Sequence, residues 1–550
     1  MTRITPSGVM RFFSFAGSMK PLFSRGSLYV LPLALLTLIP LAVVLSSFLQ
    51  PQPEIWRHLA QYVLPDVLRN TLLLVLGVGC GVLLLGVPLA WLTAVCEFPG
   101  RRFFAWALML PLAMPAYVLA FILVGLLDYT GPVQTLLREQ LGYAGWFPKI
   151  RSPGGVVFTL VLALYPYVYL LAREAFRSQG KRALEAAQTL GLTRWQAFWR
   201  VALPMARPWL AGGVMLALME SLADFGTVAI FNFDTFTTAI YKAWFALFNL
   251  PAAAQLASLL VLFVLLLAWL EARSRGARRF NGKGGQGARI VLQGWVRWCA
   301  LALCGAVLLA AFAVPVLQLV LWCAKVWAED ADRRYAGFIL RSLMLAGLTA
   351  LIVAAAALLL THFTQRFRDS ATRWLGRLAT LGYAVPGTVL AVGVFIPIAW
   401  LDNGLVFLLQ ALGGTSTELL KGTLVVMLLA LTARFLAVGH QPVEAAMQRI
   451  TRNQEDAARS LGVTGRALLW RLHLPMLRGG VLSALLLVFV ETLKEMPITL
   501  MTRPFGWDTL AVRVFEMTSE GMWERAALPS LCIVLAGLLP VLILVRQTEK

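Results

Sequence analysis

The stretch EAAQTLGLTRWQAFWRVALP, Glu185 to Pro204, returns later in the chain as DAARSLGVTGRALLWRLHLP, Asp456 to Pro475. A shift of 271 residues superimposes the two copies, and 11 of the 23 positions from Glu185 to Arg207 are then identical. Each copy is amphipathic, whereas the sequence around it is mostly apolar. The chain therefore carries an internal repeat whose most recognisable part is a short polar segment.

Each polar segment is expected to form a helix, a turn and a second helix. Ala and Leu dominate RALEAAQTL and favour the first helix, and Gly191 follows where a helix end needs a positive φ. Thr193 is expected to cap the second helix, with Gln196 completing a capping box, and Pro204 to end it. The second copy keeps the glycine and threonine signals at Gly462 and Thr464, but has Ala467 in place of the box partner.

Two interpretations of the segment remain open. Trp195, Phe198, Trp199 and Ala202 are spaced to share one helix face, which suits a helix lying flat in a membrane interface. The repeated small residues favour close approach of another surface, and two symmetric platforms suit a two-fold partner in the cytoplasm. These small residues are Ala186, Ala187, Ala457 and Ala458.

The composition of the whole chain is that of a membrane protein. Of its 550 residues 59% are hydrophobic and 14% charged, against roughly a quarter charged in soluble proteins, and the mean hydropathy is +0.75. Apolar runs long enough to cross a bilayer as helices recur along it. We expect an all-α polytopic fold with about twelve spans, near 28–48, 71–95, 103–127, 155–175, 209–231, 251–270, 295–322, 340–361, 376–400, 422–440, 480–500 and 528–546.

The distribution of charge predicts the orientation. The net charge of +21 is concentrated in alternate loops, which indicates orientation in a membrane rather than binding of nucleic acid. Both termini and both polar segments then lie in the cytoplasm. The stretch 271–293, rich in Gly and Arg, is expected to be a flexible cytoplasmic linker between two halves.

The halves are expected to be parallel six-helix repeats, 1–270 with its polar segment at about 182–207, and 294–550 with its segment at about 453–478. The same shift aligns AMPAYVLA, Ala113 to Ala120, with AVPGTVLA, Ala384 to Ala391. An even number of spans in each half gives both copies the same orientation, so a pseudo-twofold axis along the membrane normal is expected.

Four carboxylates lie within or beside apolar spans. Glu220 and Asp224 are four residues apart, and Glu491 and Glu495 repeat them, with Lys494 adjacent. Ionisable groups in a membrane helix are costly and suggest function, here a path for a hard cation. The alternative is structural, with the carboxylates capping or tying helices and Lys494 neutralising one of them.

The other chemistry-bearing residues point to no bound group. The six cysteines lie in or beside apolar runs without CxxC spacing and are interpreted as small core residues, with a metal or disulfide set as the alternative. The four histidines are scattered, so no metal site is assigned. No phosphate-binding GxxxxGK[ST] motif occurs, so this chain is not expected to hydrolyse ATP or to bind a cofactor.

Both polar segments resemble the EAA loop of permeases of type I ABC importers. The resemblance rests on EAAQTLG, on DAARSLG with Asp456 in place of Glu, and on the Leu-Pro pairs that close both segments. It implies that the segments dock in two ATPase subunits, an expected homodimer that hydrolyses ATP on the cytoplasmic face. The docking residues would be Glu185, Ala186, Ala187 and Gly191 in the first segment and Asp456, Ala457, Ala458 and Gly462 in the second.

The resemblance extends to the fused two-half permeases of ferric iron importers. It is carried by Asp224 to Ser258 and by the stretch that begins ETLKEMPITL at Glu491. It implies a passage for ferric iron across a bacterial inner membrane and a periplasmic solute-binding protein as partner. Permeases for thiamine, polyamine or phosphonate share the same frame and remain alternatives.

Two other classes of protein are alternatives to this interpretation. A twelve-helix secondary transporter also has two parallel halves, but it does not need a repeated helix-turn-helix between the fourth and fifth span of each half. A membrane enzyme would need a nucleophile-base pair, a metal cluster or a glycine-rich motif, and the sequence supplies none of these patterns.

Overall fold

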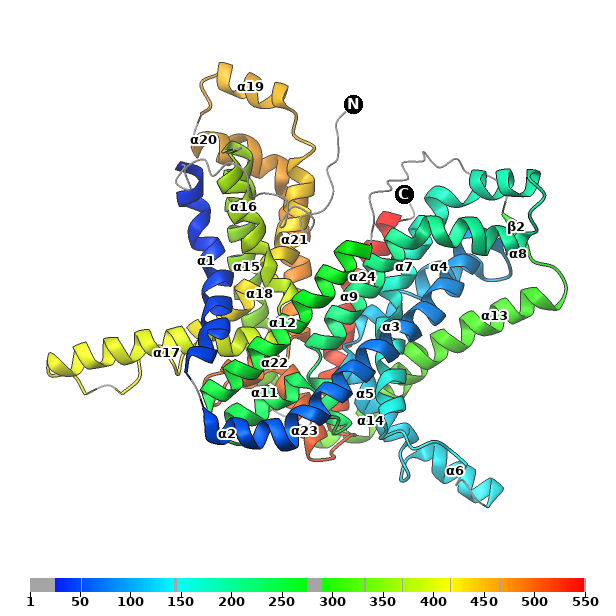
Figure 1. Ribbon diagram of the computed structural model, residues 1–550, viewed down its shortest axis with the longest axis horizontal. Coiled ribbons are helices and arrows are strands. Elements are labelled where there is room, and N and C mark those ends of the chain that lie inside the picture. The colour runs from blue at the N-terminus through cyan, green and yellow to red at the C-terminus, as the bar shows by residue number, and fades with distance from the viewer. Residues whose placement is uncertain are drawn as a thin grey trace. The chain divides into compact units, whose positions relative to one another are not determined.

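The computed structural model describes residues 25–50, 52–142, 146–274, 289–330, 333–367, 369–415, 417–464 and 466–548. Nearly all of them are helical, and Figure 1 follows the helices along the chain by colour. The basic N-terminus and most of the expected linker lie outside the described residues.

The α-helices are, in chain order, α1 (Arg25–Ser46), α2 (Pro53–His58), α3 (Leu64–Val95), α4 (Arg101–Ala107), α5 (Ala116–Leu127), α6 (Pro132–Leu141), α7 (Pro153–Thr189), α8 (Arg194–Ala197), α9 (Leu203–Ala223), α10 (Gly226–Ile230), α11 (Phe236–Phe245), α12 (Leu250–Ser274), α13 (Trp295–Leu308), α14 (Val314–Asp330), α15 (Arg333–Arg366), α16 (Ser370–Ala379), α17 (Gly387–Ala411), α18 (Leu424–Met447), α19 (Arg452–Ser460), α20 (Arg466–Leu468), α21 (Leu474–Lys494), α22 (Pro497–Thr502), α23 (Leu510–Ser519) and α24 (Ala527–Thr548).

Eleven helices in the described part of the chain are long and apolar enough to cross a membrane. They overlap the first eleven predicted spans. The twelfth span corresponds to a shorter apolar stretch, Ala527–Ile543, within α24. The all-α, multi-pass class is confirmed.

Two predicted spans, 103–127 and 376–400, are not single helices. In the first half α4 is followed by a 3₁₀ turn, and α5 begins only after Pro115. In the second half α16 is followed by a similar turn, and α17 begins after Pro386. Proline lacks an N–H and forces extended backbone on the residue before it, as at Met114 (ψ 123°) and Val385 (ψ 128°).

Four wide, π-helical turns in the described residues share one sequence signal. They cover Leu59–Val63, Phe198–Ala202, Leu309–Ala313 and Leu469–His473. Each is followed by an aliphatic residue and then proline, at Pro65, Pro204, Pro315 and Pro475. A wider turn moves away the carbonyl that the proline ring would strike, so the helix continues where an ordinary α-turn would break.

The chain divides into two compact units that do not coincide with the sequence halves. Unit 1 takes its described residues from Met1–Trp56, Ile240–Val261 and Asp332–Arg513; unit 2 takes them from Arg57–Ala239, Leu262–Ala331 and Val514–Lys550. The first apolar helix therefore belongs to the unit built mainly from second-half residues. The division of the sequence into two repeats, 1–270 and 294–550, stays a prediction.

Unit 1 has its core between α1 and the later helices α15, α16, α18 and α21. Val30 and Ala34 of α1 are buried with Leu360 of α15 and Leu436 of α18. The Thr37 hydroxyl donates a hydrogen bond to the Ala379 carbonyl at 3.1 Å. Apolar burial and this bond together hold α1 in the unit.

Unit 2 is centred on α3, α7 and α9, which approach closely through glycines. A Cβ atom on Gly81 would lie 2.3 Å from Val161 of α7, and one on Gly86 would lie 3.0 Å from Val168. Small residues at such crossings let membrane helices pack backbone to backbone.

The expected linker is anchored at its C-terminal end. Ile290 and Val291 form a short strand, β2, that pairs in parallel with β1, Cys96–Glu97, in unit 2. Glu97 makes ion pairs with Arg101 at 3.0 Å and with Arg289 at 3.2 Å. The expectation of flexibility is thus wrong for residues 289–291. The start of the range, up to Ser274, belongs to α12.

Candidate functional site

The first polar segment begins as the end of a long transmembrane helix. α7 runs unbroken through Glu185, Ala186 and Ala187 to Thr189. Gly191 has a φ of +85°; its N–H donates to the Gln188 carbonyl, and the next N–H donates to the Ala187 carbonyl, both at 3.0 Å. This pair of bonds is a Schellman motif, which satisfies carbonyls at the helix end. The predicted glycine cap is confirmed.

The second segment ends its first helix in the same way. Gly462 has a φ of +78°, its N–H donates to the Arg459 carbonyl, and the Val463 N–H donates to the Ala458 carbonyl, both at 2.9 Å. The third residue of the EAA or DAA triplet accepts the longer-range bond in both copies. The two segments therefore share a backbone motif, and the glycine is what allows it.

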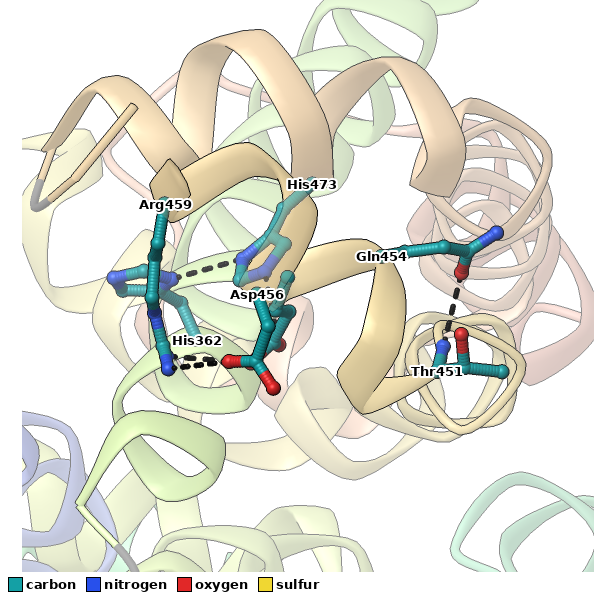
Figure 2. Close-up of polar contacts among 7 residues, drawn as sticks. His362, Thr451, Gln454, Asp456, Arg459 and His473 are labelled. Carbon is teal, nitrogen blue, oxygen red and sulfur yellow. Dashed lines mark hydrogen bonds and ion pairs between the residues drawn. The ribbon is translucent and has the colours of Figure 1, made fainter. Parts of the chain in front are cut away.

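The segments differ in how their first helix starts. In the second copy α18 ends at Met447, and a separate helix, α19, starts after Thr451 with a capping box to Gln454. The Thr451 N–H donates to Gln454 Oε1 at 2.9 Å, as Figure 2 shows. The first copy has Gly180 and Ala183 at these positions and cannot form the box, and its helix continues from α7.

The second helix of each segment confirms one expectation and corrects another. Thr193 and Gln196 form the predicted capping box, with N–H to side-chain oxygen distances of 3.1 and 3.3 Å. Pro204, however, does not end the helix. The chain passes from α8 through the wide turn Phe198–Ala202 directly into α9, and the second copy passes in the same way into α21.

The predicted apolar face is only partly packed. Phe198 meets Trp91 of α3 edge to face at 4.7 Å, and Ala202 is buried. Trp195 and Trp199 are exposed and line an apolar groove of about 1310 Å³ in unit 2. The wide turn rotates the later positions away from the face that a regular helix would form.

The docking residues implied by the EAA resemblance are partly visible as side chains. Ala187 is buried, Asp456 and Ala457 are exposed, and Ala458 is half-buried. Asp456 pairs with Arg459 on the same helix at 3.1 Å (Figure 2). The side chains of Glu185 and Ala186 lie outside the part that the structure describes.

An exposed leucine precedes the capping glycine in both segments, a feature that the sequence patterns missed. Leu190 and Leu461, related by the repeat shift, are each 83% exposed. A Cβ atom on Gly191 or Gly462 would meet nothing within 4 Å in the described structure. Each segment thus presents an apolar side chain and open backbone at its tip. The usable signal in the sequence was that a leucine directly precedes the capping glycine in both copies.

Two of the four candidate path carboxylates hold local structure. Asp224 follows α9 and accepts hydrogen bonds from the Thr227 hydroxyl at 2.9 Å and the Val228 N–H at 3.2 Å. Glu495 follows α21 and accepts the Ile498 and Thr499 N–H groups at 2.9 and 3.2 Å. Each carboxylate thereby caps the next short helix, α10 or α22.

The other two carboxylates are placed differently. Glu491 is partly exposed, and its Oε1 lies 3.8 Å from Lys494 Nζ on the same helix. Glu220 is half-buried one turn before Asp224. Glu220 and Asp224 belong to unit 2, and Glu491 and Glu495 to unit 1.

Unit 1 also contains buried polar groups that motif reasoning did not select. Arg434 of α18 is 9% exposed and directs Nη1 toward the Val385 carbonyl at 3.5 Å. His362 and His473 are buried against each other. A charged or imidazole side chain inside an apolar run, as in LLLTHFT and LTARFLA, was the usable signal.

Residues 86–279 match the family described as binding-protein-dependent transport system inner membrane component. The chain is 27% identical over 493 residues to the Fe(3+)-transport system permease protein FbpB 2 of Haemophilus influenzae, covering 88% of this chain and 90% of that one. It is 25% identical over 484 residues to the ferric transport system permease protein FbpB of Actinobacillus pleuropneumoniae, covering 82% and 67%.

A shorter similarity links the chain to a permease named for another solute. It is 29% identical over 188 residues to the molybdenum transport system permease protein ModB of Escherichia coli, covering 34% of this chain and 80% of that one. The ferric relatives thus align with most of the chain and the molybdenum relative with about a third.

Proposed function

Since this chain belongs to the binding-protein-dependent transport system inner membrane components, the permeases of type I ABC importers, we propose that it forms the passage for ferric iron in such an importer. The observation that carries the proposal is the length of the similarity to two permeases named for ferric transport. Both polar segments lie within an alignment of that length. The molybdenum relative aligns with about a third of the chain and favours the ABC frame rather than its solute.

We further propose that the energy comes from separate ATPase subunits, which dock on the two polar segments, hereafter the coupling segments. The sequence lacks a phosphate-binding loop of its own, and no cofactor is needed by the chain. Two segments of like backbone geometry suit two copies of one ATPase subunit. Both termini and both segments then face the cytoplasm, in line with the positive charge of their loops. A periplasmic binding protein delivers the iron on the other side.

The decisive experiment is transport by the assembled system. The chain is reconstituted in vesicles with its ATPase subunits, and the ferric-loaded binding protein is supplied outside. Radioactive ferric iron should accumulate only with hydrolysable ATP inside, and molybdate should not accumulate. Uptake at full rate by the chain alone would refute the proposal, as would ATP-driven uptake of molybdate but not of ferric iron.

The exposed leucines supply a test of ATPase docking. Leu190→Asp and Leu461→Asp place a charge where we expect an apolar contact. Retention of the ATPase subunit during purification should therefore fall about tenfold for either change, which corresponds to a loss of about 1.4 kcal/mol. Co-purification at equal membrane level measures this. Leu412→Asp is the control, because Leu412 is an exposed leucine of unit 1 outside both segments. Equal retention in all three variants would contradict docking on the segments.

We propose that Glu220 and Glu491, rather than the capping carboxylates, contribute to the passage. Asp224 and Glu495 are occupied by backbone donors, whereas Glu491 is partly exposed with one lysine at 3.8 Å. The double change Glu220→Gln and Glu491→Gln keeps the size and one accepting oxygen of each side chain but removes both charges, and should lower ferric uptake about tenfold at normal protein level. Uptake measured at several iron concentrations tests this. An unchanged uptake curve would remove both residues from the path and leave them a structural role.

A further inference from the structure

Three polar side chains link α19 of the second coupling segment to the transmembrane helix α15. Glu455 lies on α19, directly before Asp456, and its Oε1 is 3.3 Å from His473 Nε2. His473 ends the wide turn that leads into α21, and its Nδ1 is 3.2 Å from Nδ1 of His362 on α15. Figure 2 shows the two imidazoles facing each other. The chain Glu455–His473–His362 therefore spans three elements of unit 1.

The link is buried. The histidines are 4% and 3% exposed, and the Glu455 side chain is 19% exposed. Polar groups at such depth persist when they are hydrogen-bonded, and losing one partner leaves the next one unsatisfied. A break at any point is therefore expected to disturb the whole chain.

The protonation states that allow the link are limited. Ionised Glu455 accepts from His473 Nε2–H, so neutral His473 offers Nδ1 as the acceptor for Nδ1–H of His362. One added proton is compatible with the link: on His362 Nε2 it leaves the direction of the second bond unchanged, and on His473 Nδ1 it reverses that bond once the His362 proton has moved from Nδ1 to Nε2. Two added protons would set two N–H groups against each other.

The residues at the corresponding positions of the first half cannot form such a chain. The repeat shift puts Leu184, Ala202 and Trp91 at the positions of Glu455, His473 and His362. There Trp91 of α3 instead packs edge to face on Phe176 of α7 at 5.2 Å and on Phe198 of the wide turn at 4.7 Å. The first segment also continues from a transmembrane helix, whereas α19 is separated from α18 by a turn. The second segment needs a connection that the first has through its backbone.

We propose that Glu455, His473 and His362 form a latch that holds α19 in register with α15 and α21, so that motion of the docked ATPase subunit reaches the membrane helices through side chains in this half. The inference rests on the proposed function, because it concerns the coupling segment of that importer. The three residues are positioning residues; they touch neither solute nor nucleotide. The two halves then share the backbone motif but differ in how the segment is joined to the membrane helices, through a continuous helix in the first half and through side-chain hydrogen bonds in the second.

The test uses the complete importer in vesicles and the first-half residues as replacements. Glu455→Leu and His473→Ala should each lower the amount of iron transported per ATP hydrolysed about tenfold. The double variant should be no worse than either single one, because each single change already breaks the whole hydrogen-bonded link. Glu455→Gln keeps an oxygen that accepts from His473 and should retain most of the coupling. Glu444→Leu is the matched control, since Glu444 pairs with His440 within a single helix at 3.5 Å.

A second readout is independent of transport. Release of α19 should speed trypsin cleavage after the exposed Arg459 about tenfold in Glu455→Leu and His473→Ala, but not in Glu444→Leu. Normal coupling and normal cleavage in the first two variants would overturn the latch, and so would losses that add in the double variant. If the wild-type importer itself shows no ATP-driven iron uptake, the proposed function fails; if only the variants match wild type, the latch alone fails.

Discussion

Replacing both Gly191 and Gly462 with valine is expected to abolish coupled uptake while the protein still reaches the membrane. Both glycines hold a left-handed backbone, with φ of +85° and +78°, and both close a Schellman motif. A β-branched residue is strongly disfavoured there, at a cost of at least about 1–2 kcal/mol for each segment. The turn would change its path, and Leu190 and Leu461 would no longer point where a partner could meet them.

The cause of this effect can be separated from a steric clash. A Cβ atom at either glycine meets nothing within 4 Å, so only the backbone conformation opposes the change. Asparagine tolerates the left-handed region, and Gly191→Asn with Gly462→Asn should therefore keep most of the uptake. Gly142→Val is the matched control, because Gly142 ends α6 with a φ of +69° and is equally open.

The measurement is iron uptake and ATP hydrolysis in vesicles at equal protein level. We expect uptake to be lost in the valine pair, retained in the asparagine pair and unaffected by Gly142→Val. Full uptake in the valine pair would mean that the turn geometry does not matter for coupling. Equal loss in the valine and asparagine pairs would mean that a side chain of any kind is excluded, for instance by a docked partner.

Local signals in the sequence predicted local structure well. Gly191 and Gly462 end helices, and Thr193 with Gln196 forms its capping box, because each of these depends on atoms within a few residues. Pro204 was interpreted wrongly for an equally local reason. A proline excludes the ordinary α-turn but not a wider one, and the sequence does not show which of the two outcomes, a break or a wide turn, follows.

Contacts between distant residues could not be predicted in the same way. His362 and His473 are 111 residues apart, and the packing of α1 on α16 joins residues more than 300 apart. Hydrophobic periodicity says that a span will be buried, but not against which other span. The candidate carboxylates show the same limit. The sequence identified all four acids, but not which of them cap a following helix. That depends on where α9 and α21 end, which places Asp224 and Glu495 just before α10 and α22.

Removing the carboxylate of Glu495 is expected to destabilise unit 1 far more than the matching change at Asp224 destabilises unit 2. Glu495 is 6% exposed, and its carboxylate lies near the guanidinium of the buried Arg434. Both groups lie next to Gly387, where an added Cβ atom would be 2.9 Å from Glu495 Oε1 and 3.0 Å from Arg434 Nη1. Glu495→Ala therefore removes a helix cap and also the negative charge that lies near the buried Arg434 guanidinium. A lost cap alone costs about 1 kcal/mol, and leaving a buried cation without a compensating charge adds up to about 3–5 kcal/mol.

The first half supplies the control for this difference. The repeat shift places Ala163 at the position of Arg434, so Asp224→Ala removes a cap without exposing a buried charge. Thermal unfolding of the purified protein in detergent should show a clearly larger drop in Tm for Glu495→Ala than for Asp224→Ala. Arg434→Ala combined with Glu495→Ala should recover part of the loss, because the unpaired charge is then gone. Equal drops in Tm for the two single variants, with no recovery in the double one, would mean that Glu495 acts only as a cap and that Arg434 is satisfied by other groups.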